Sequence, residues 1–144
     1  MKAWWLVATL LLGAPAVGDE TRLENILSGD HRSADNKARD RYRHPAQTLA
    51  FFDVEPDMTV VEIWPGGGWY TEILAPYLRK EGKLYAAHFS PDSSREYFRR
   101  SRKAFMERLE AEPGLYDRVE VTRFDPPKET DIAPPGSADR VLTF

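Results

Sequence analysis

Apolar and polar positions alternate along the chain in two patterns, which predict helices and strands in turn. Four short runs have the composition and spacing of strands: residues 58–64, 83–89, 118–124 and 138–144. Helical spacing of apolar residues precedes and separates them: residues 21–27, 45–52, 69–80 and 90–112. Because strands that alternate with helices form parallel sheets, this order predicts an α/β fold with a doubly wound sheet.

Two local signals predict where helices end and begin. Gly82 follows the helix of residues 69–80, in the position that a left-handed helix cap requires. Ser90, followed by Pro91 and Asp92, predicts a helix that starts at Ser90 as its capping residue. That helix is expected to continue to about Glu112.

The first residues have the pattern of a leader. Lys2 is followed by an apolar run from Ala3 to Leu12, and small residues then stand at the positions that a signal peptidase prefers. The run is short for a membrane span. We therefore expect a signal peptide over residues 1–18, cleaved after Ala16 or Gly18, and a periplasmic or secreted product. An uncleaved interfacial anchor is the alternative.

The remainder is expected to have two parts. Residues 19–44 are predicted to be an N-terminal helical segment, of which residues 31–43 are almost wholly polar and should keep most of their surface in water. Residues 45–144 are predicted to form a partial α/β domain. The last predicted strand reaches Phe144 as an apolar run and would leave an exposed edge, so we interpret the sequence as a fragment.

Composition narrows the classes of function. The length of 144 residues suits a single core, and 20 Lys and Arg against 23 Asp and Glu give a net charge of −3. Nucleic acid is therefore not an expected partner. The absence of cysteine excludes disulfides and thiolate nucleophiles, and the 3 histidines lack the paired spacing of a zinc site. No metal site is predicted.

The residues with the clearest chemical signal gather at the end of the first predicted strand. Glu62 lies in that strand, and Pro65 and three glycines follow it. A glycine turn there lets a ligand approach backbone N–H groups in the crevice of a doubly wound sheet. The phosphate loop is excluded because no Gly-Lys-Ser or Gly-Lys-Thr follows, and the dinucleotide pattern fails at Thr71. The pattern Glu62-x-x-x-Gly66-x-Gly68 remains.

The stretch VVEIWPGGGWYTEILAPYL, residues 60–78, resembles motif I of the class I S-adenosylmethionine-dependent methyltransferases. The longer segment of residues 39–85 resembles a subfamily of exported, methyltransferase-like bacterial proteins. The resemblance implies a Rossmann-like methyltransferase fold, of which this chain would be the N-terminal half, with about four parallel strands and flanking helices. It also implies S-adenosylmethionine as cofactor and a methyl acceptor that the sequence does not identify.

The resemblance places cofactor contacts at seven positions: Glu62, Trp64, Gly66, Gly67, Gly68, His88 and Asp125. Glu62 matches the acidic residue of the motif. Trp64 replaces its first glycine, and His88 replaces the acid that binds the ribose hydroxyls, although a neutral imidazole offers one acceptor only. Asp125 matches an acid near the adenine, or is a turn residue before Pro126.

Two classes of function stay open at this point. The first is a methyltransferase, which acts by positioning its substrates, needs no nucleophile and is expected to be active only in a chain longer than this one. No catalytic residue is assigned. The second is a noncatalytic exported protein that binds another small molecule in the same glycine-turn pocket, with Trp64, Trp69, Tyr70 and His88 around it. Membrane contact is expected only through the leader.

Overall fold

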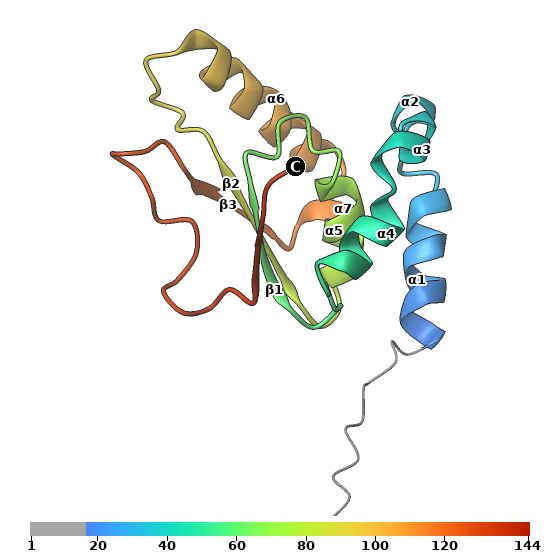
Figure 1. Cartoon of the computed structure of the whole chain (residues 1–144). Coiled ribbons are helices and arrows are strands. Elements are labelled where there is room, and N and C mark those ends of the chain that lie inside the picture. Colours follow the sequence, from blue (N-terminus) through green and yellow to red (C-terminus); the bar gives the residue numbers. More distant parts are fainter. Residues whose placement is uncertain (1–16) are drawn as a thin grey trace, which may run out of the picture.

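The computed structural model describes residues 17–144 (Figure 1), so the predicted leader lies outside the described residues except for its last two positions. The helices are α1 (Val17–Ser28), α2 (Ala34–Ala38), α3 (Asp40–Arg43), α4 (Pro45–Phe51), α5 (Thr71–Leu78), α6 (Glu96–Ala111) and α7 (Pro113–Tyr116). The strands are β1 (Thr59–Ile63), β2 (Lys83–His88), β3 (Val119–Arg123) and β4 (Arg140–Leu142). All four predicted strands are therefore present.

The four strands form one parallel sheet in the order β3-β2-β1-β4. In register, Val61 of β1 lies between Tyr85 of β2 and Val141 of β4. The predicted α/β class with a doubly wound parallel order is confirmed. The chain runs from β1 outward to β3 and then returns to the other side of β1, so the strand order reverses between β1 and β4. Ligands bind at such a reversal in open α/β sheets.

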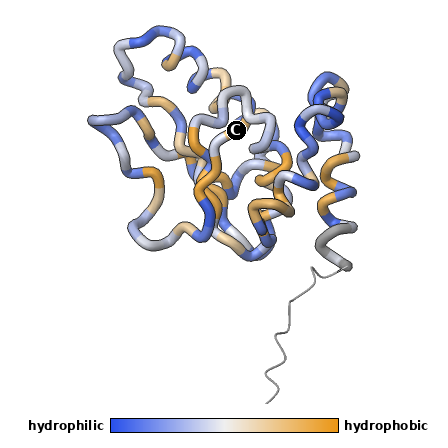
Figure 2. Tube along the Cα trace, in the orientation of Figure 1, coloured by the Kyte–Doolittle hydropathy of each residue, from blue (hydrophilic) through white to orange (hydrophobic). Residues whose placement is uncertain are grey.

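Both faces of the sheet are covered, which explains why the central strands are apolar on both sides. One face packs against α5, α6 and α7 through a large cluster that includes Val60, Ile73 and Phe105. The loop between β3 and β4 covers the other face with Ile132 and its neighbours. Figure 2 shows the contrast between the hydrophobic strands and the hydrophilic helices α2 and α3.

Helix α5 contains a proline, and a residue in the turn after α1 compensates for it. Pro76 has no N–H to donate to the carbonyl of Glu72 one turn earlier. The imidazole of His31 takes that place, with Nε2 3.1 Å from the Glu72 carbonyl oxygen. Arg22 of α1 in turn donates to the Pro76 carbonyl at 3.4 Å. These contacts fix α1 and the turn after it against α5.

The predicted start of the last helix, residues 90–112, was wrong. Helix α6 begins at Glu96 instead of following Ser90. The Ser90 hydroxyl accepts the N–H of Asp92 at 3.2 Å, and the Ser93 hydroxyl accepts the N–H of Arg95 at 3.4 Å. Such local side-chain bonds compete with helical ones and hold residues 90–95 as turns.

The predicted left-handed cap at Gly82 was also wrong, because Gly82 is not among the described residues with positive φ. Crowding explains the glycine instead. A Cβ at Gly82 would lie 2.5 Å from the Met58 carbonyl oxygen and 2.7 Å from that of Pro56. The backbone of the turn before β1 therefore approaches the chain too closely for any side chain.

Alanine at Gly82 is therefore expected to lower the free energy of unfolding by about 2–3 kcal/mol, the cost of overpacking against backbone. Urea denaturation of the variant and the parent protein measures this cost. Alanine at Gly114 is the matched control, since a Cβ there meets nothing within 4 Å. Equal denaturation midpoints for the two variants would contradict the crowding argument.

Candidate functional site

A cleft of about 340 Å³ opens at the carboxyl end of β1, where the strand order reverses. Its size falls within the range of small-molecule sites. It is lined by Glu62, the turn after β1, the polar helices α2 and α3, Arg108 of α6 and Phe144 after β4. Figure 1 shows the turn after β1 and the chain end after β4 on the same side of the sheet, near α6.

Glu62 contributes a buried carboxyl group to this cleft. The residue is 2% exposed, and the Thr71 hydroxyl donates to one of its oxygens at 2.6 Å. The other oxygen has no hydrogen bond within residues 17–144. Burial raises the pKa of Glu62 to about 7, although the Thr71 hydroxyl and the charge of Arg108 oppose this rise. A cationic group in the cleft would therefore find a poorly solvated acceptor.

The glycine turn presents bare backbone to the cleft. Gly66 and Gly68 have φ values of 58° and 82°, in the region that favours glycine. A Cβ at Gly66 or at Gly67 would meet nothing within 4 Å, so a ligand can approach the backbone there. Arg108 holds the turn from the side of α6, donating to the Gly67 carbonyl at 2.6 Å.

His88, at the end of β2, contacts the same turn. Its ring is fully buried, and Nδ1 accepts the N–H of Phe89 at 2.8 Å. The proton of the neutral ring is therefore on Nε2, which lies 3.3 Å from the Gly66 carbonyl oxygen and donates to it. Burial lowers the pKa of His88 to about 4, so the ring is neutral at pH 7. His88 links the end of β2 to the turn.

The predicted cofactor residues divide into two groups. The cleft brings together Glu62, Trp64, Gly66 and Gly67. Gly68 lies behind them, where a Cβ would approach the Phe105 ring at 3.2 Å. His88 does not line the cleft, and Asp125 lies beyond β3 with its N–H bonded to the Glu129 carbonyl at 2.9 Å. Contacts of His88 and Asp125 with a ribose and an adenine stay predictions.

Trp64 has an unusual backbone and a well-defined ring position. Its φ of 49° lies in the left-handed region, which a bulky side chain rarely adopts. The ring centroid lies 5.7 Å from that of Phe89 and 5.4 Å from that of Phe124, and Nε1 donates to the Phe124 carbonyl at 3.0 Å. The ring therefore packs against the residues that follow β2 and β3. It is 45% exposed.

A buried ionic network behind the turn was missed from the sequence. Glu72 is fully buried and accepts from Arg32 at 2.8 Å, from Arg108 at 2.5 Å and from Asn36 at 2.9 Å. Arg32 also forms a two-pronged ion pair with Asp40, at 2.6 and 2.8 Å. The expectation that residues 31–43 keep most of their surface in water fails at Arg32, which is 2% exposed.

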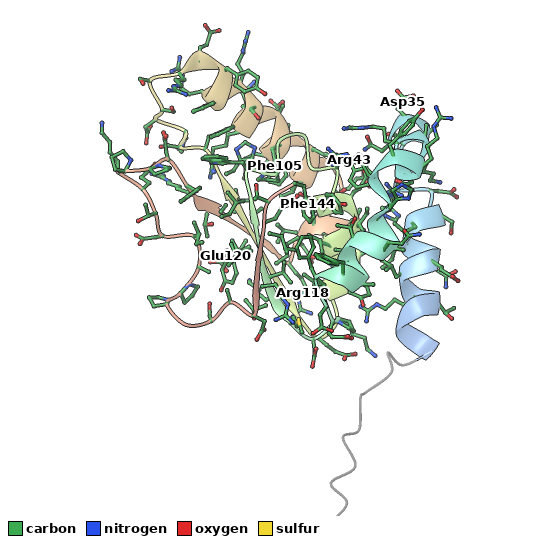
Figure 3. The ribbon with its side chains drawn as sticks, in the orientation of Figure 1. Asp35, Arg43, Phe105, Arg118, Glu120 and Phe144 are labelled. Carbon is green, nitrogen blue, oxygen red and sulfur yellow. The ribbon has the colours of Figure 1, made fainter. Side chains whose placement is uncertain are left out.

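Two further arginines stand at the rim of the cleft. The guanidinium of Arg43 lies over the Trp69 ring at 4.7 Å and that of Arg39 at 6.0 Å. Neither has an ion-pair partner within the described part of the chain. Trp69 and Tyr70 are almost wholly buried, and Tyr70 stacks on Phe144 with centroids 3.4 Å apart. Figure 3 labels Arg43 and Phe144 beside the glycine turn.

Within residues 17–144, no group of three or more His, Cys, Asp or Glu side chains could hold a metal ion. None of the described helices has both the length and the apolar composition needed to cross a membrane.

Comparison with known proteins identifies solved structures that have a similar fold. No protein-family model matches the chain, and no curated protein matches its sequence. The chain is similar in structure to a cyclopropane-fatty-acyl-phospholipid synthase-like protein from Lactobacillus casei ATCC 334, with 23% identity and a TM-score of 0.57 over 86% of this chain and 46% of that one. It is also similar to cofactor-bound Rv0187 from MTB, with 19% identity and a TM-score of 0.50 over 94% of this chain and 55% of that one.

A proposed O-methyltransferase from Klebsiella pneumoniae gives a weaker likeness, with 18% identity and a TM-score of 0.41 over 81% of this chain and 46% of that one. The chain thus spans about half the length of the solved structures that it matches. At these identities the likeness to the first two structures shows a shared Rossmann-like α/β fold and nothing finer.

Proposed function

We propose that this chain is the cofactor-binding part of an S-adenosylmethionine-dependent methyltransferase-like protein. The observation that carries the proposal is the position of Glu62, a buried carboxyl with one unbonded oxygen beside an open glycine turn at the strand-order reversal. The likeness to cofactor-bound Rv0187 supports it.

The cleft fits one end of S-adenosylmethionine better than the other. Glu62 would accept from the ammonium of the methionyl part, and the backbone at Gly66 and Gly67 gives that part room. The nucleoside would extend toward the ends of β2 and β3, where the Trp64 ring packs on Phe89 and Phe124. The Trp64 ring would have to move for the whole cofactor to bind.

Glu62 and the turn would have separate tasks in cofactor binding. The cofactor supplies an electrophilic methyl group, and this chain supplies position and charge. At neutral pH Glu62 would lose its proton when an ammonium group pairs with it, because an adjacent positive charge favours the carboxylate. Arg108 and His88 would keep the turn in its open shape through the Gly67 and Gly66 carbonyls.

The first test is calorimetric titration with S-adenosylhomocysteine. Alanine at Glu62 and tryptophan at Gly66 should each weaken binding by roughly tenfold or more, through loss of an ionic hydrogen bond and through filling of the turn. Glycine at Trp64 should strengthen it roughly tenfold, since the backbone φ of 49° suits glycine and the ring no longer fills the nucleoside position. No binding by either the parent protein or the Trp64→Gly variant at millimolar ligand would overturn the proposal.

A noncatalytic small-molecule-binding protein is the second candidate, and the packed position of Trp64 favours it. A ring held by Phe89, Phe124 and a hydrogen bond leaves a smaller site than the cofactor needs. Equal affinity of the parent and the Trp64→Gly variant for S-adenosylhomocysteine would show that the Trp64 ring does not block the nucleoside position. If the parent protein binds a different small molecule and the Trp64→Gly variant does not, the second candidate is favoured.

We also propose that the protein is exported by a leader in residues 1–18, which the sequence pattern supports. Export would separate the protein from the cytosolic supply of S-adenosylmethionine, which again gives weight to the second candidate. N-terminal sequencing of the periplasmic or secreted product would locate the cleavage after Ala16 or Gly18.

A further inference from the structure

The charge of the cleft points to the chemistry of a ligand beyond the cofactor. Three guanidinium groups line it, from Arg39, Arg43 and Arg108, against a single side-chain carboxyl, that of Glu62. Arg108 is already bound by the Glu72 carboxylate and the Gly67 carbonyl. The charges of Arg39 and Arg43 have no counterpart among the described residues and are left for a ligand.

The two rim arginines are held by aromatic rings rather than by carboxylates. The Arg43 guanidinium lies 4.7 Å from the Trp69 ring and 5.8 Å from the Tyr70 ring. Trp69 is itself fixed, because its Nε1 donates to the Asn36 carbonyl at 3.2 Å. A guanidinium stacked on a ring keeps its N–H groups available at its edge, where a carboxylate or phosphate binds in two-pronged fashion.

The cofactor alone does not balance this charge. S-adenosylmethionine carries a sulfonium, an ammonium and one carboxylate, so its net charge is positive. With Glu62 assigned to the ammonium, a cleft with two unpaired guanidinium groups favours a second ligand that is an anion. The exposed faces of Trp64 and Phe144, at 45% and 44%, add apolar surface beside the same arginines.

We propose that Arg39 and Arg43 form an acid-binding subsite, and that the second ligand of the cleft is a small aromatic or apolar acid with a carboxylate or phosphate group. Insofar as this acid is the methyl acceptor, the inference rests on the proposed function. Arg43 is the main contact, and Arg39 adds charge from the turn between α2 and α3. The apolar part of the acid would face Phe144 and the Trp64 ring.

The test uses benzoate as the anionic probe and benzamide as its neutral counterpart, each titrated by NMR without cofactor. Benzoate should bind the parent protein at least about tenfold more tightly than benzamide, and glutamine at Arg43 should abolish that preference. Glutamine at Arg41 is the matched control, because Arg41 is exposed on the same helix and stacks on Tyr42 outside the cleft. Lysine at Arg43 should retain part of the preference, and Arg39→Gln should reduce it.

Several results would overturn the inference. These are no binding of benzoate at tens of millimolar, equal binding of benzoate and benzamide, or equal losses for the Arg41 and Arg43 variants. Unchanged melting temperatures of these variants separate lost binding from lost folding.

A second experiment distinguishes binding of a separate acid from binding of the cofactor's own carboxylate. S-adenosylhomocysteine and 5′-methylthioadenosine share the nucleoside, but only the first has a carboxylate. If Arg43→Gln weakens S-adenosylhomocysteine alone and benzoate never binds, the arginines serve the cofactor and the inference fails. If benzoate binds through Arg43 and neither nucleoside binds the parent or the Trp64→Gly variant, the acid subsite stands and the proposed function fails.

Discussion

Glutamine in place of Glu72 is expected to lower the free energy of unfolding by about 3–5 kcal/mol, the loss seen when one partner of a buried ion pair is removed. The Glu72 side chain is fully buried, as is that of Arg32. Arg32 would keep Asp40, but Arg108 would lose its only carboxylate within the described residues. Denaturation in urea at neutral pH measures the loss.

Glu107→Gln is the control for this prediction. Glu107 pairs with Lys103 one turn away on α6, and both side chains are more than half exposed, at 61% and 76%. Removing such a surface pair should change stability by about 0.5 kcal/mol or less. A loss at Glu72 no larger than that at Glu107 would show that the network carries little stability.

Glutamine in place of Glu62 is expected to act in the opposite direction and to stabilise the protein by about 3 kcal/mol near pH 8. The pKa of Glu62 is raised from 4.5 to about 7 in the folded protein, chiefly by burial. As pH rises from 4.5 to 7, the unfolded chain loses this proton before the folded one does, so wild-type stability falls. Above pH 7 the wild-type protein keeps this full loss of stability. Glutamine carries no charge at any pH and can still accept the hydrogen bond from Thr71.

The pH dependence is the distinguishing measurement. Near pH 5 the gain from Glu62→Gln should shrink to about 1 kcal/mol or less, because most of the penalty has not yet developed. Thermal or urea unfolding of both proteins from about pH 5 to pH 8 gives the curve. A gain that does not change with pH would mean that the Glu62 pKa is not raised.

The two buried glutamates thus differ in what balances their charge. Glu72 is matched by Arg32 and Arg108 in the folded chain, whereas Glu62 has a hydroxyl and an unbonded oxygen that faces the cleft. Keeping an acid at position 62 is a cost that a cationic ligand group could offset. Saturating S-adenosylhomocysteine should accordingly reduce or reverse the advantage of Glu62→Gln.

The local sequence pattern was sufficient to predict the strands and the positions of Glu62 in β1 and of the glycine turn after it. Each of these features depends on neighbours a few positions away. It was insufficient for Arg32, whose burial depends on Glu72, 40 positions along the chain. It also failed at Ser90, where two serine hydroxyls hold turns in place of a helix cap. The position of the Trp64 ring depends on its contacts with Phe89 and Phe124, and no periodicity in the sequence links these residues to Trp64.

The Glu72 network has a consequence for how this sequence can change over evolutionary time. Five positions share it: Arg32, Asn36, Asp40, Glu72 and Arg108. A change at any one of them would remove an ion-pair or hydrogen-bond partner from the buried side chain of Glu72 or Arg32. We therefore expect these positions to vary in concert among related sequences. The polar stretch ahead of the sheet should then covary with one position of α5 and one of α6, as a single unit.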